Sequence, residues 1–312
     1  MASTESEGKT PSIAVVGSYN VGLTMRVPQF PIPGETVIGE GFAEGPGGKG
    51  SNQAIAASRL GAETTFIGRV GTDRYGDDAF DLWEQEGIDT SQVSRDAEAH
   101  TGAGFVLVDA EGENEITVAP GANATLSAHH VDDAADVIAE SDVLLVQLEI
   151  ETDPIERVLE VAASNDVEVV LNPAPVRDLD PAVLDQAAYL TPNQNEARSL
   201  AGIDPEDEVA DRAIAEQLSE QVDGTVVMTV GSDGALLVDE AVTAVDAPTV
   251  DPVDTTGAGD AFNGAFAVGL ASGMTQTTAA HFACAAGALT VTASEVVPGL
   301  PTRDAVEELH SS

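Results

Sequence analysis

Cationic side chains are scarce in this sequence: 12 Lys and Arg residues stand against 54 Asp and Glu residues, for a formal net charge of −42. Such a chain repels nucleic acids and anionic membranes, so we expect neither as a partner. Repulsion among the carboxylates fades in strong salt, where the Debye length is about 3 Å. The composition is therefore typical of a salt-rich cytosol of the kind that halophiles maintain. An acidic interaction protein is the alternative, but the acids are spread along the chain and do not form a tail.

The sequence contains a single cysteine, Cys284, so no disulfide bond can form within the chain. It lies in an alanine-rich stretch and is expected to be a small buried hydrophobic residue. No apolar run reaches the roughly 18 residues that a membrane-spanning helix requires. The first residues, MASTESEGKT, are polar and acidic, unlike a signal peptide. We therefore expect a cytoplasmic protein whose residues 1–10 form a disordered tail.

The hydrophobic share of 43% is enough for a full core, and 312 residues suit one main domain with a small appendage. From residue 143 onward, apolar strands alternate with helices, which predicts an α/β fold whose parallel sheet is covered on both faces. The Gly- and Pro-rich stretch 28–50 and a hairpin at 105–118 predict small exposed strands that form a lid. The predicted strands are 13–16, 65–70, 143–148, 167–171 and 225–230, and the predicted helices are 51–60, one from Asp153, and 207–222.

The strongest local signal is VDTTGAGDAFNGAFAVGLASG, in which a strand-like stretch runs into the turn Gly257-Ala258-Gly259 and a helix follows. Glycines just before a helix let backbone N–H groups point at an anion, and the helix dipole adds to this. Asp260 would repel a phosphate, so its presence suggests a base that takes the proton of an alcohol attacking phosphorus. Proton transfer of this kind is worth about 10²–10⁴-fold. The alternative is an Asp that only caps the helix.

The motif GPGGKG is the second signal. Gly45, Gly47 and Gly50 match the dinucleotide fingerprint G-x-G-x-x-G, with Asp73 about twenty residues further on. That match is weak, because the first strand is followed by GSYN and a Pro-rich excursion. The motif is not a Walker A loop either, because Gly50 stands where Ser or Thr should follow the lysine. We interpret it as a glycine turn that approaches a small hydroxylated ligand, with Lys49 in the site; a surface lysine is the alternative.

Polar residues also follow several predicted strands, at the edge where open α/β sheets bind ligands. Asn20 follows the first strand and Glu149 follows the strand at 143–148. Asn193 and Glu196 are spaced i, i+3, so they could share a helix face near a metal. Each alone could be a capping or solvent-exposed residue, but their recurrence at one edge favours a site.

These segments together resemble the ribokinase family of PfkB-type sugar kinases over about residues 12–305. GGKG-x-NQA and LNPAP are specific to the ribokinase branch, whereas GAGD is shared by the wider family. The resemblance rests on GSYN at 17–20, PIPGETV at 31–37, GGKGSNQA at 47–54, GEN at 112–114, PGANA at 120–124, QLE at 147–149, LNPAP at 171–175, TPNQNEA at 191–197, TVGSDG at 229–234 and DTTGAGDAFNGA at 254–265.

The resemblance implies a ribokinase-like three-layer sandwich over residues 11–312, with a mostly parallel central sheet and a small β-sheet lid from about residues 21–45 and 100–120. It also implies a homodimer through the lids, and transfer of the γ-phosphoryl group of ATP to a sugar, with Mg²⁺ and an activating K⁺ or similar ion. Implied sugar contacts are Asn20, Gly22, Gly47, Gly48, Lys49, Asn52, Glu149 and Asp260, and Gly257, Ala258 and Gly259 would form the anion hole. Implied nucleotide contacts are Asn193, Thr229, Gly231, Gly234, Gly257, Gly259 and Cys284. Glu196 would organise Mg²⁺ through water, and Asp254, Thr256, Thr290, Ala293, Glu295 and Gly299 would surround the monovalent cation.

One departure from the family concerns the acceptor. Ribokinases read N-x-D after the first strand, where the Asp binds two ribose hydroxyls, whereas this chain reads Asn20-Val21-Gly22. Losing that acceptor removes about 1–3 kcal/mol of discrimination. Either another group compensates and the 5-hydroxyl of free ribose is phosphorylated, or the sugar carries a substituent such as a 1-phosphate or a base. Arg26 could assist a phosphorylated sugar if the backbone turns it inward.

Two other function classes compete with the kinase. An NAD(P)-dependent oxidoreductase rests on GPGGKG alone and would require detectable NAD(P)H binding. A non-catalytic sugar-binding module has no need of Asp260 behind an anion hole, and an absence of phosphoryl transfer with every sugar would favour it.

Overall fold

The computed structural model describes residues 9–177 and 179–310. The predicted disordered tail, residues 1–10, therefore lies outside the described residues except for its last two. Of these, Lys9 forms an ion pair with Asp142, with 2.6 Å between Nζ and Oδ1. No helix among the described residues is long and apolar enough to cross a membrane.

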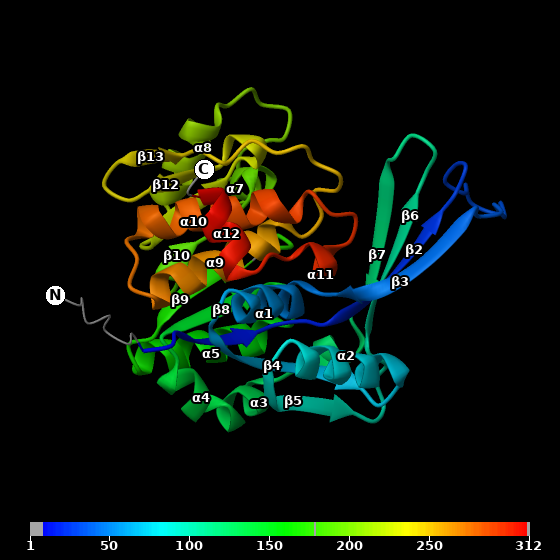
Figure 1. Cartoon of the computed structure of the whole chain (residues 1–312), viewed down its shortest axis with the longest axis horizontal. Helices are drawn as coiled ribbons and strands as arrows, with labels where there is room; N and C mark the ends of the chain where they lie inside the picture. Colours follow the sequence, from blue (N-terminus) through cyan, green and yellow to red (C-terminus); the bar gives the residue numbers. More distant parts are fainter. Residues whose placement is uncertain (1–8, 178, 311–312) are drawn as a thin grey trace.

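Nine strands of the described chain form one twisted sheet in the middle of the body (Figure 1). The seven strands from β11 to β5 are parallel, and β12 and β13 add an antiparallel edge. Parallel strands buried on both faces need continuous apolar runs, as in VLLVQ of β8. The spatial order is β13 (Val242–Val245), β12 (Ala235–Val238), β11 (Thr225–Thr229), β10 (Tyr189–Leu190), β9 (Glu168–Asn172), β8 (Val143–Gln147), β1 (Ser12–Val16), β4 (Glu63–Gly71) and β5 (Asp89–Asp96).

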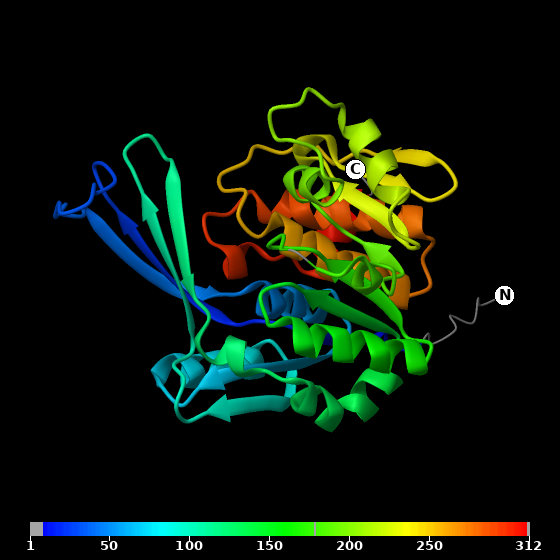
Figure 2. The same cartoon turned by 180° about the vertical axis from the view of Figure 1, so that it is seen from behind.

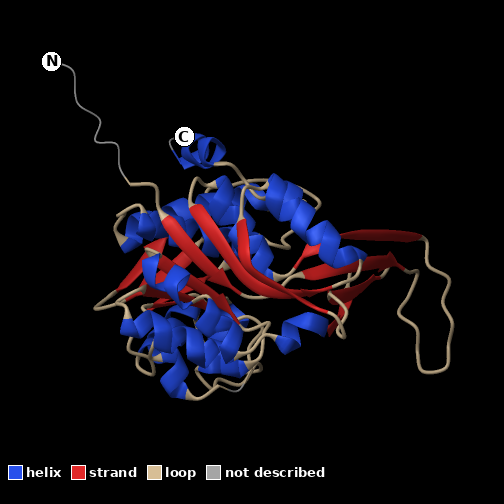
Figure 3. Cartoon of the chain, turned by 90° about the horizontal axis from the view of Figure 1, so that it is seen from below, coloured by secondary structure: helices blue, strands red, loops and turns tan. Residues whose placement is uncertain are grey.

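Helices cover both faces of this sheet, so the predicted three-layer α/β sandwich is confirmed (Figure 3). Successive side chains of β1 point to opposite faces of the sheet: Ile13 and Val15 belong to one core cluster, and Ala14 and Val16 belong to the other. The first layer holds α1 (Lys49–Arg59), α2 (Arg74–Gln85), α9 (Ala258–Ala271), α10 (Gln276–Thr290), α11 (Val296–Gly299) and α12 (Arg303–His310). The second holds α3 (Ala128–Asp133), α4 (Ala135–Glu140), α5 (Thr152–Ser164), α6 (Pro181–Leu184), α7 (Gln194–Leu200) and α8 (Asp211–Ser219), and short 3₁₀ turns occupy η1 (Gly121–Thr125) and η2 (Gly231–Asp233).

The contact between α1 and α9 positions the residues discussed below. Helix α9 is buried on nearly all sides, because it lies between α1, α10 and the sheet. A Cβ atom at Gly264 would lie 2.6 Å from Cβ of Ala56, so only glycine allows α1 and α9 to pack this closely. The close approach brings Asn52 and Gln53 of α1 against Asp260 of α9.

A separate four-stranded sheet projects from the body and forms the lid (Figures 1 and 2). Strands β2 and β6 pair in parallel, and the two outer pairings are antiparallel. Residues 27–40, within the stretch predicted to form small strands, contain no strand and make the long loop at the tip. The lid strands, in order, are β3 (Gly41–Gly47), β2 (Asn20–Arg26), β6 (Gly102–Val108) and β7 (Asn114–Ala119).

Two helices differ in extent from the sequence predictions. Helix α1 begins two residues before the predicted start, so Lys49 is its first residue. Helix α8 is shorter than the predicted 207–222. The preceding carbonyls of Asp204, Asp207 and Val209 accept hydrogen bonds from the guanidinium of Arg198 instead of from helical N–H groups. Arg198 lies only 6 to 11 residues before these carbonyls, but its side-chain hydrogen bonds leave no signal in the helical periodicity.

Candidate active site

The GGKG loop packs onto the chain segment that follows β1. Gly48 has φ of +90°, and a Cβ atom there would lie 2.6 Å from N of Asn20. A Cβ atom at Gly50 would lie 2.6 Å from N of Ser18. At these two positions the glycines let the loop approach the protein's own backbone closely. The sequence had suggested instead that the loop approaches a ligand.

Glu149 joins three segments at the end of β8. Its Oε2 accepts hydrogen bonds from Ser18 Oγ (2.5 Å), the Lys49 backbone N (3.0 Å) and Asn20 Nδ2 (3.3 Å). The carboxylate therefore holds the end of β1, the start of β2 and the start of α1 together. Ser18 was not among the predicted site residues, because a lone serine after a strand carries no distinctive signal.

Asp260 lies in the first turn of α9 with 7% of its surface exposed. Its Oδ2 accepts from Asn52 Nδ2 (2.8 Å) and its Oδ1 from Gln53 Nε2 (3.0 Å). The helix cap is Gly257, so the alternative of an Asp that only caps the helix is wrong. Burial raises the pKa of Asp260, against the opposing effects of the Lys49 ammonium and the two amide donors. Such a carboxyl accepts a proton more readily than an exposed Asp.

Lys49 is half-buried among carboxylates and is not an ordinary surface lysine. Burial alone would lower the pKa of its ammonium, but the charges of Asp260, Glu149 and Glu196 hold that pKa above its usual value. Lys49 therefore stays cationic in the site. Three carboxylates around one ammonium leave a net negative cluster, which a neutral sugar hydroxyl tolerates better than an anion does.

The turn before α9 has the form of an anion-binding loop. Gly257 has φ of +82°, and a Cβ atom there would lie 2.5 Å from Cγ1 of Val296. Gly259 faces open space. Ala258 N donates a long hydrogen bond to the carbonyl of Thr255 (3.4 Å), and the N–H groups that follow it in the first turn of α9 are available to an anion. The predicted strand before this turn is absent from the described residues: the N–H groups of residues 253 and 254 bond to the carbonyl of Val291, not to a neighbouring strand.

Residues predicted to bind the nucleotide gather at the ends of β10 and β11. Asn193 and Thr229 form an isolated parallel bridge. Asn193 is the N-cap of α7, and it exchanges hydrogen bonds with Glu196 in a capping box (2.8 and 2.9 Å). Asn193 thus lies just before the helix and not on its face, but the two side chains meet as the i, i+3 spacing predicted, and their place near a metal stays a prediction. Gly231 and Gly234 bound the turn after β11 with positive φ, and a Cβ atom at Gly234 would lie 2.0 Å from O of Val245.

Cys284 is a buried core residue of α10, as expected from its surroundings. Its Sγ lies 3.9 Å from the carbonyl O of Val245. Burial raises the pKa of the thiol to about 12, with a smaller contribution from Asp246. The predicted contact with a nucleotide stays a prediction.

The residues predicted to surround a monovalent cation lie on three neighbouring segments. Thr256 N donates to Asp254 Oδ1 (2.8 Å), and Asp254 N donates to the carbonyl of Val291 (3.2 Å), next to Thr290. Among the described residues, no group of three or more His, Cys, Asp or Glu side chains could hold a metal ion. Any cation here would depend on backbone oxygens. On the third segment, Ala293 and Glu295 precede Gly299, where a Cβ atom would lie 3.0 Å from O of Thr290.

The dinucleotide fingerprint is not supported by the position of GPGGKG. The motif follows β3, a lid strand, and not the first strand of the parallel sheet. Asp73, the candidate ribose ligand, caps α2 by accepting from Gly76 N (3.0 Å) and also bonds Thr101. The oxidoreductase hypothesis therefore loses both the glycine motif and the acidic residue on which it rested.

Asn20 and Gly22 lie on the same face of β2, because side chains alternate along a strand. Gly22 pairs with Gly45 of β3 on one side and with Gly104 of β6 on the other. We call Gly22, Gly45 and Gly104 the glycine row. The nearest neighbour of a Cβ atom at Gly22 would be O of Gly45 at 3.5 Å, and the other two positions face open space. The missing acidic side chain therefore leaves room beside Asn20.

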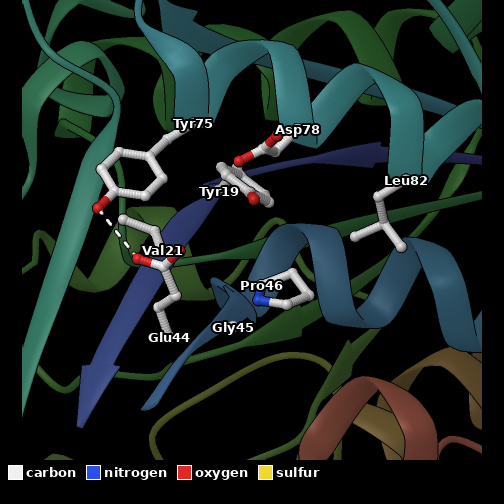
Figure 4. Close-up of a pocket in the computed structure, with 8 residues that line it drawn as sticks. All are labelled: Tyr19, Val21, Glu44, Gly45, Pro46, Tyr75, Asp78 and Leu82. Carbon is white, nitrogen blue, oxygen red and sulfur yellow. Dashed lines mark hydrogen bonds between the residues drawn. The ribbon is translucent and has the colours of Figure 1, made fainter. Parts of the chain in front are cut away.

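A cavity of about 180 Å³ lies on the opposite face of the lid root, between the lid and α2 (Figure 4). Tyr19, Val21 and Pro46 line it, and these residues alternate with Asn20 and Gly47 along their strands. Tyr75 and Asp78 of α2 close it from the other side. This cavity is thus separate from the group around Asp260.

Several polar residues that contact the predicted site residues carried no signal strong enough to single them out. Asn123 donates to Asn20 Oδ1 (3.0 Å) and to the carbonyl of Tyr19 (2.9 Å) from a distant part of the chain. Others lie on helices α1 and α9 or at the ends of β8, β9 and β10, where their burial was not visible from the sequence. They are Gln53, Asn263, Gln147, Asn172 and Thr191.

Comparisons with known proteins agree with this geometry. The model of the pfkB family of carbohydrate kinases matches residues 10–303. A ribokinase from Haemophilus influenzae is 37% identical over 293 residues, which cover 94% of this chain and 96% of that protein. A ribokinase structure from Thermotoga maritima has a TM-score of 0.87 and 35% identity, covering 97% of this chain and all of that one. An Arabidopsis thaliana ribokinase with ribose and ATP has a TM-score of 0.89 and 28% identity, with coverage of 97% and 100%. This chain belongs to the pfkB family of carbohydrate kinases.

Proposed function

We propose that the enzyme transfers the γ-phosphoryl group of ATP to the primary 5-hydroxyl of ribose or of a ribose derivative, with Asp260 as the catalytic base. The observation that carries the proposal is the buried Asp260 carboxylate, held by Asn52 and Gln53 directly behind the turn at residues 257–259. The similarity to ribokinases, one of them with ribose and ATP, supports ribose and ATP as substrates.

In the proposed reaction the sugar hydroxyl lies between Asp260 and the γ-phosphorus. Its oxygen forms a bond to phosphorus while the bond from phosphorus to the bridging oxygen of ADP breaks, and the hydroxyl proton passes to Asp260. The N–H groups of the turn at 257–259 stabilise the negative charge on the transferring group. Lys49 offsets the charge of Asp260 without taking its proton, because the ammonium stays cationic.

The site residues fit Mg²⁺ bound with ATP. Glu196 uses Oε2 in the capping box, which leaves its other oxygen for a water ligand of the metal. When bound, Mg²⁺ would neutralise phosphate charge. We propose that Asn193, Thr229, Gly231 and Gly234 line the nucleotide at the same edge of the sheet.

A potassium-like ion is proposed beside the anion-binding turn. The absence of a Cβ atom at Gly299 leaves space beside the carbonyl of Thr290, and backbone oxygens suit such an ion. Asp254 would add the charge. Turnover measured in NaCl, KCl and a large organic cation at equal ionic strength tests this proposal. Equal rates in all three salts would contradict it.

A ribose derivative is the second candidate acceptor, and the glycine row favours it. Three adjacent glycines leave bare backbone on the face of the lid that carries Asn20, where a substituent on the sugar could lie. Arg26 lies on the same face of β2, four residues beyond Gly22, and would suit a 1-phosphate on the sugar. A nucleoside base is the other possible substituent.

A substrate panel decides between the acceptors. Ribose, ribose 1-phosphate, nucleosides and fructose would be compared with ATP and Mg²⁺ in molar KCl, because the net charge of −42 calls for strong screening. The highest kcat/KM for free ribose would exclude the substituent. Transfer to none of the acceptors, with sugar still bound, would favour a non-catalytic binding module. An NAD(P)H titration under the same conditions tests the oxidoreductase alternative, for which we expect no binding.

We propose a homodimer through the outer faces of the two lids. Met25, Phe42 and Phe105 are 40%, 63% and 53% exposed on the lid face opposite Asn20, and such an exposed apolar patch is typical of an interface. The double variant Phe42→Ser, Phe105→Ser should sediment as a monomer. Ile116→Ser on the other face is the matched control and should sediment like the parent.

A further inference from the structure

Behind Asp260 lies a set of buried polar side chains that neither the sugar nor the nucleotide explains. Their exposures are between 0% and 6%, and burying an amide or hydroxyl is unfavourable unless it is hydrogen-bonded. Each of these side chains has at least one partner, and together they form one connected network in which Gln147 Oε1 is the one atom without a partner. The members are Gln53, Gln147, Asn172, Thr191 and Asn263.

Gln53 is the branching point of this network. Its Nε2 donates to Asp260 Oδ1 (3.0 Å) and to Asn172 Oδ1 (3.1 Å), which uses both N–H bonds of the amide. Its Oε1 accepts from Gln147 Nε2 at 2.6 Å. Every hydrogen-bonding atom of the Gln53 side chain is therefore engaged, and only one of its partners is a reacting group.

The network returns to the anion-binding turn by a second route. Asn172 Nδ2 donates to the carbonyl of Thr191 (3.0 Å), and Thr191 Oγ1 donates to Asn263 Oδ1 (2.5 Å). Asn263 Nδ2 then donates to the carbonyl of Gly259 (2.8 Å), the residue before Asp260. The hydrogen bonds thus close a ring that joins the base to the turn across α1, β9 and α9.

The orientation of each amide in this ring is determined by its partners. A carboxylate only accepts, so Gln53 must present its NH₂ group to Asp260, and its oxygen then faces Gln147. The oxygen of Gln147 points in turn at Gly17, where a Cβ atom would lie 2.0 Å from Oε1. A reversed Gln53 would place oxygen against oxygen at Asp260. Gly17, the first residue of GSYN, therefore leaves the space that this orientation requires.

We propose that Gln53 is a positioning residue for phosphoryl transfer: it orients the Asp260 carboxylate and couples that orientation, through Asn172, Thr191 and Asn263, to the carbonyl of Gly259. The inference rests on the proposed role of Asp260 as base. Gln53 is fully buried and does not touch the sugar side, so it acts through Asp260. The remaining charges near Asp260 are Lys49, Glu149 and Glu196.

Gln53→Met keeps the volume and removes the donor. We expect kcat to fall roughly 10- to 100-fold, the cost of losing one hydrogen bond to a charged group, with little change in KM for the sugar. The acidic limb of the kcat–pH profile should move to higher pH. An amide donor favours the charged carboxylate, so its loss raises the pKa of Asp260 further.

Gln147→Met is the matched control, because it changes the same residue type at the same burial, one hydrogen bond further from Asp260. We expect it to lower the melting temperature while kcat and the acidic limb stay near the parental values. Equal losses of kcat in the two variants, with identical pH profiles, would overturn the positioning role and leave only packing.

Gln53→Glu tests the proposal if the Met variant does not fold. While the introduced carboxyl group is protonated it can still donate to Asp260, so turnover should survive at low pH. Turnover should fall on an added alkaline limb, as the proton leaves and two buried carboxylates repel each other. A profile without that limb would contradict the proposal. A parent enzyme inactive with every sugar would instead contradict the proposed function, so the two failures are distinguishable.

Discussion

The base side of the site, around Asp260, and the lid side, around the glycine row, differ in how completely contacts hold their residues in place. Asp260 is buried, and both of its oxygens accept from amides, one of which, Gln53, belongs to a closed hydrogen-bond network. On the lid, the glycine row has almost nothing within contact distance. Polar groups in a connected network have few alternative arrangements, whereas an open glycine tolerates a new side chain. We therefore expect the body to determine the chemistry and the lid to determine the acceptor.

The largest expected effect is on the base side. Asp260→Asn keeps the size of the side chain but cannot take the proton, and its NH₂ group replaces one of the two oxygens that accept from Asn52 and Gln53, so kcat should fall at least about 10²–10⁴-fold. Initial rates with ATP and the best acceptor measure it. A variant that keeps more than about a tenth of the parental kcat would contradict a base worth that much.

Asp260→Asn should also change how the stability of the protein depends on pH. Because burial raises the pKa of Asp260, the folded parent binds that proton more tightly than the unfolded chain does, and it gains stability as pH falls through the raised pKa. Above that pKa the buried charge is unfavourable. The Asn variant should therefore melt at a higher temperature than the parent at neutral and alkaline pH, and the difference should shrink in acid. Melting curves across pH check this.

The next effect separates two glycines of the anion-binding turn. Gly257→Ala forces a positive φ on a residue with a Cβ atom, at about 1–2 kcal/mol, and creates a clash with Val296. We expect lower stability and a loss of kcat of about 10²-fold, comparable to losing one oxyanion-hole donor. Gly259→Ala is the control for folding. It lies inside α9 in open space, so it should melt no lower than the parent. Equal destabilisation by both would contradict this account.

Much of the body could be predicted from the sequence because its signals are local. Apolar runs such as the one in β8 predict buried parallel strands, and GAGD predicts an anion-binding turn with an acid beside it. The resemblance to ribokinases placed Asn20, Lys49 and Glu149 at one site. These three do meet, through Glu149 Oε2.

The network behind Asp260 could not be predicted, because its partners are distant in the chain. Gln53 and Asn172 are separated by 119 residues and Thr191 and Asn263 by 72. A polar residue at the end of an apolar strand looks like a surface residue until its neighbours are known. For Asn193 the sequence left a cap and a site residue both open, since i, i+3 spacing fits both a capping box and a shared helix face.

A smaller effect is expected on the lid side. Gly22→Asp introduces the acid that ribokinases have there, and its Cβ atom meets nothing closer than 3.5 Å. The ratio of kcat/KM for free ribose to that for a ribose derivative should rise roughly 5- to 150-fold, equivalent to about 1–3 kcal/mol, with an unchanged melting temperature. Asn114→Asp on β7, exposed on the same face of the lid and two strands away from Arg26, is the control for added charge and should leave the ratio unchanged. An unchanged ratio in Gly22→Asp would mean that the acceptor is chosen elsewhere.

The smallest effect concerns an exposed ion pair between the lid and the body. Arg74 of α2 pairs with Glu44 of β3 at 2.7 Å, beside Tyr75 at the mouth of the cavity in Figure 4, and both partners are largely exposed. Exposed pairs contribute about 0–1 kcal/mol and are screened by salt. Arg74→Ala should thus lower the melting temperature slightly in dilute buffer and not at all in molar KCl, with kcat unchanged in both. A clear loss of kcat in molar KCl would show that the lid depends on this pair, and that the two regions are less independent than their packing indicates.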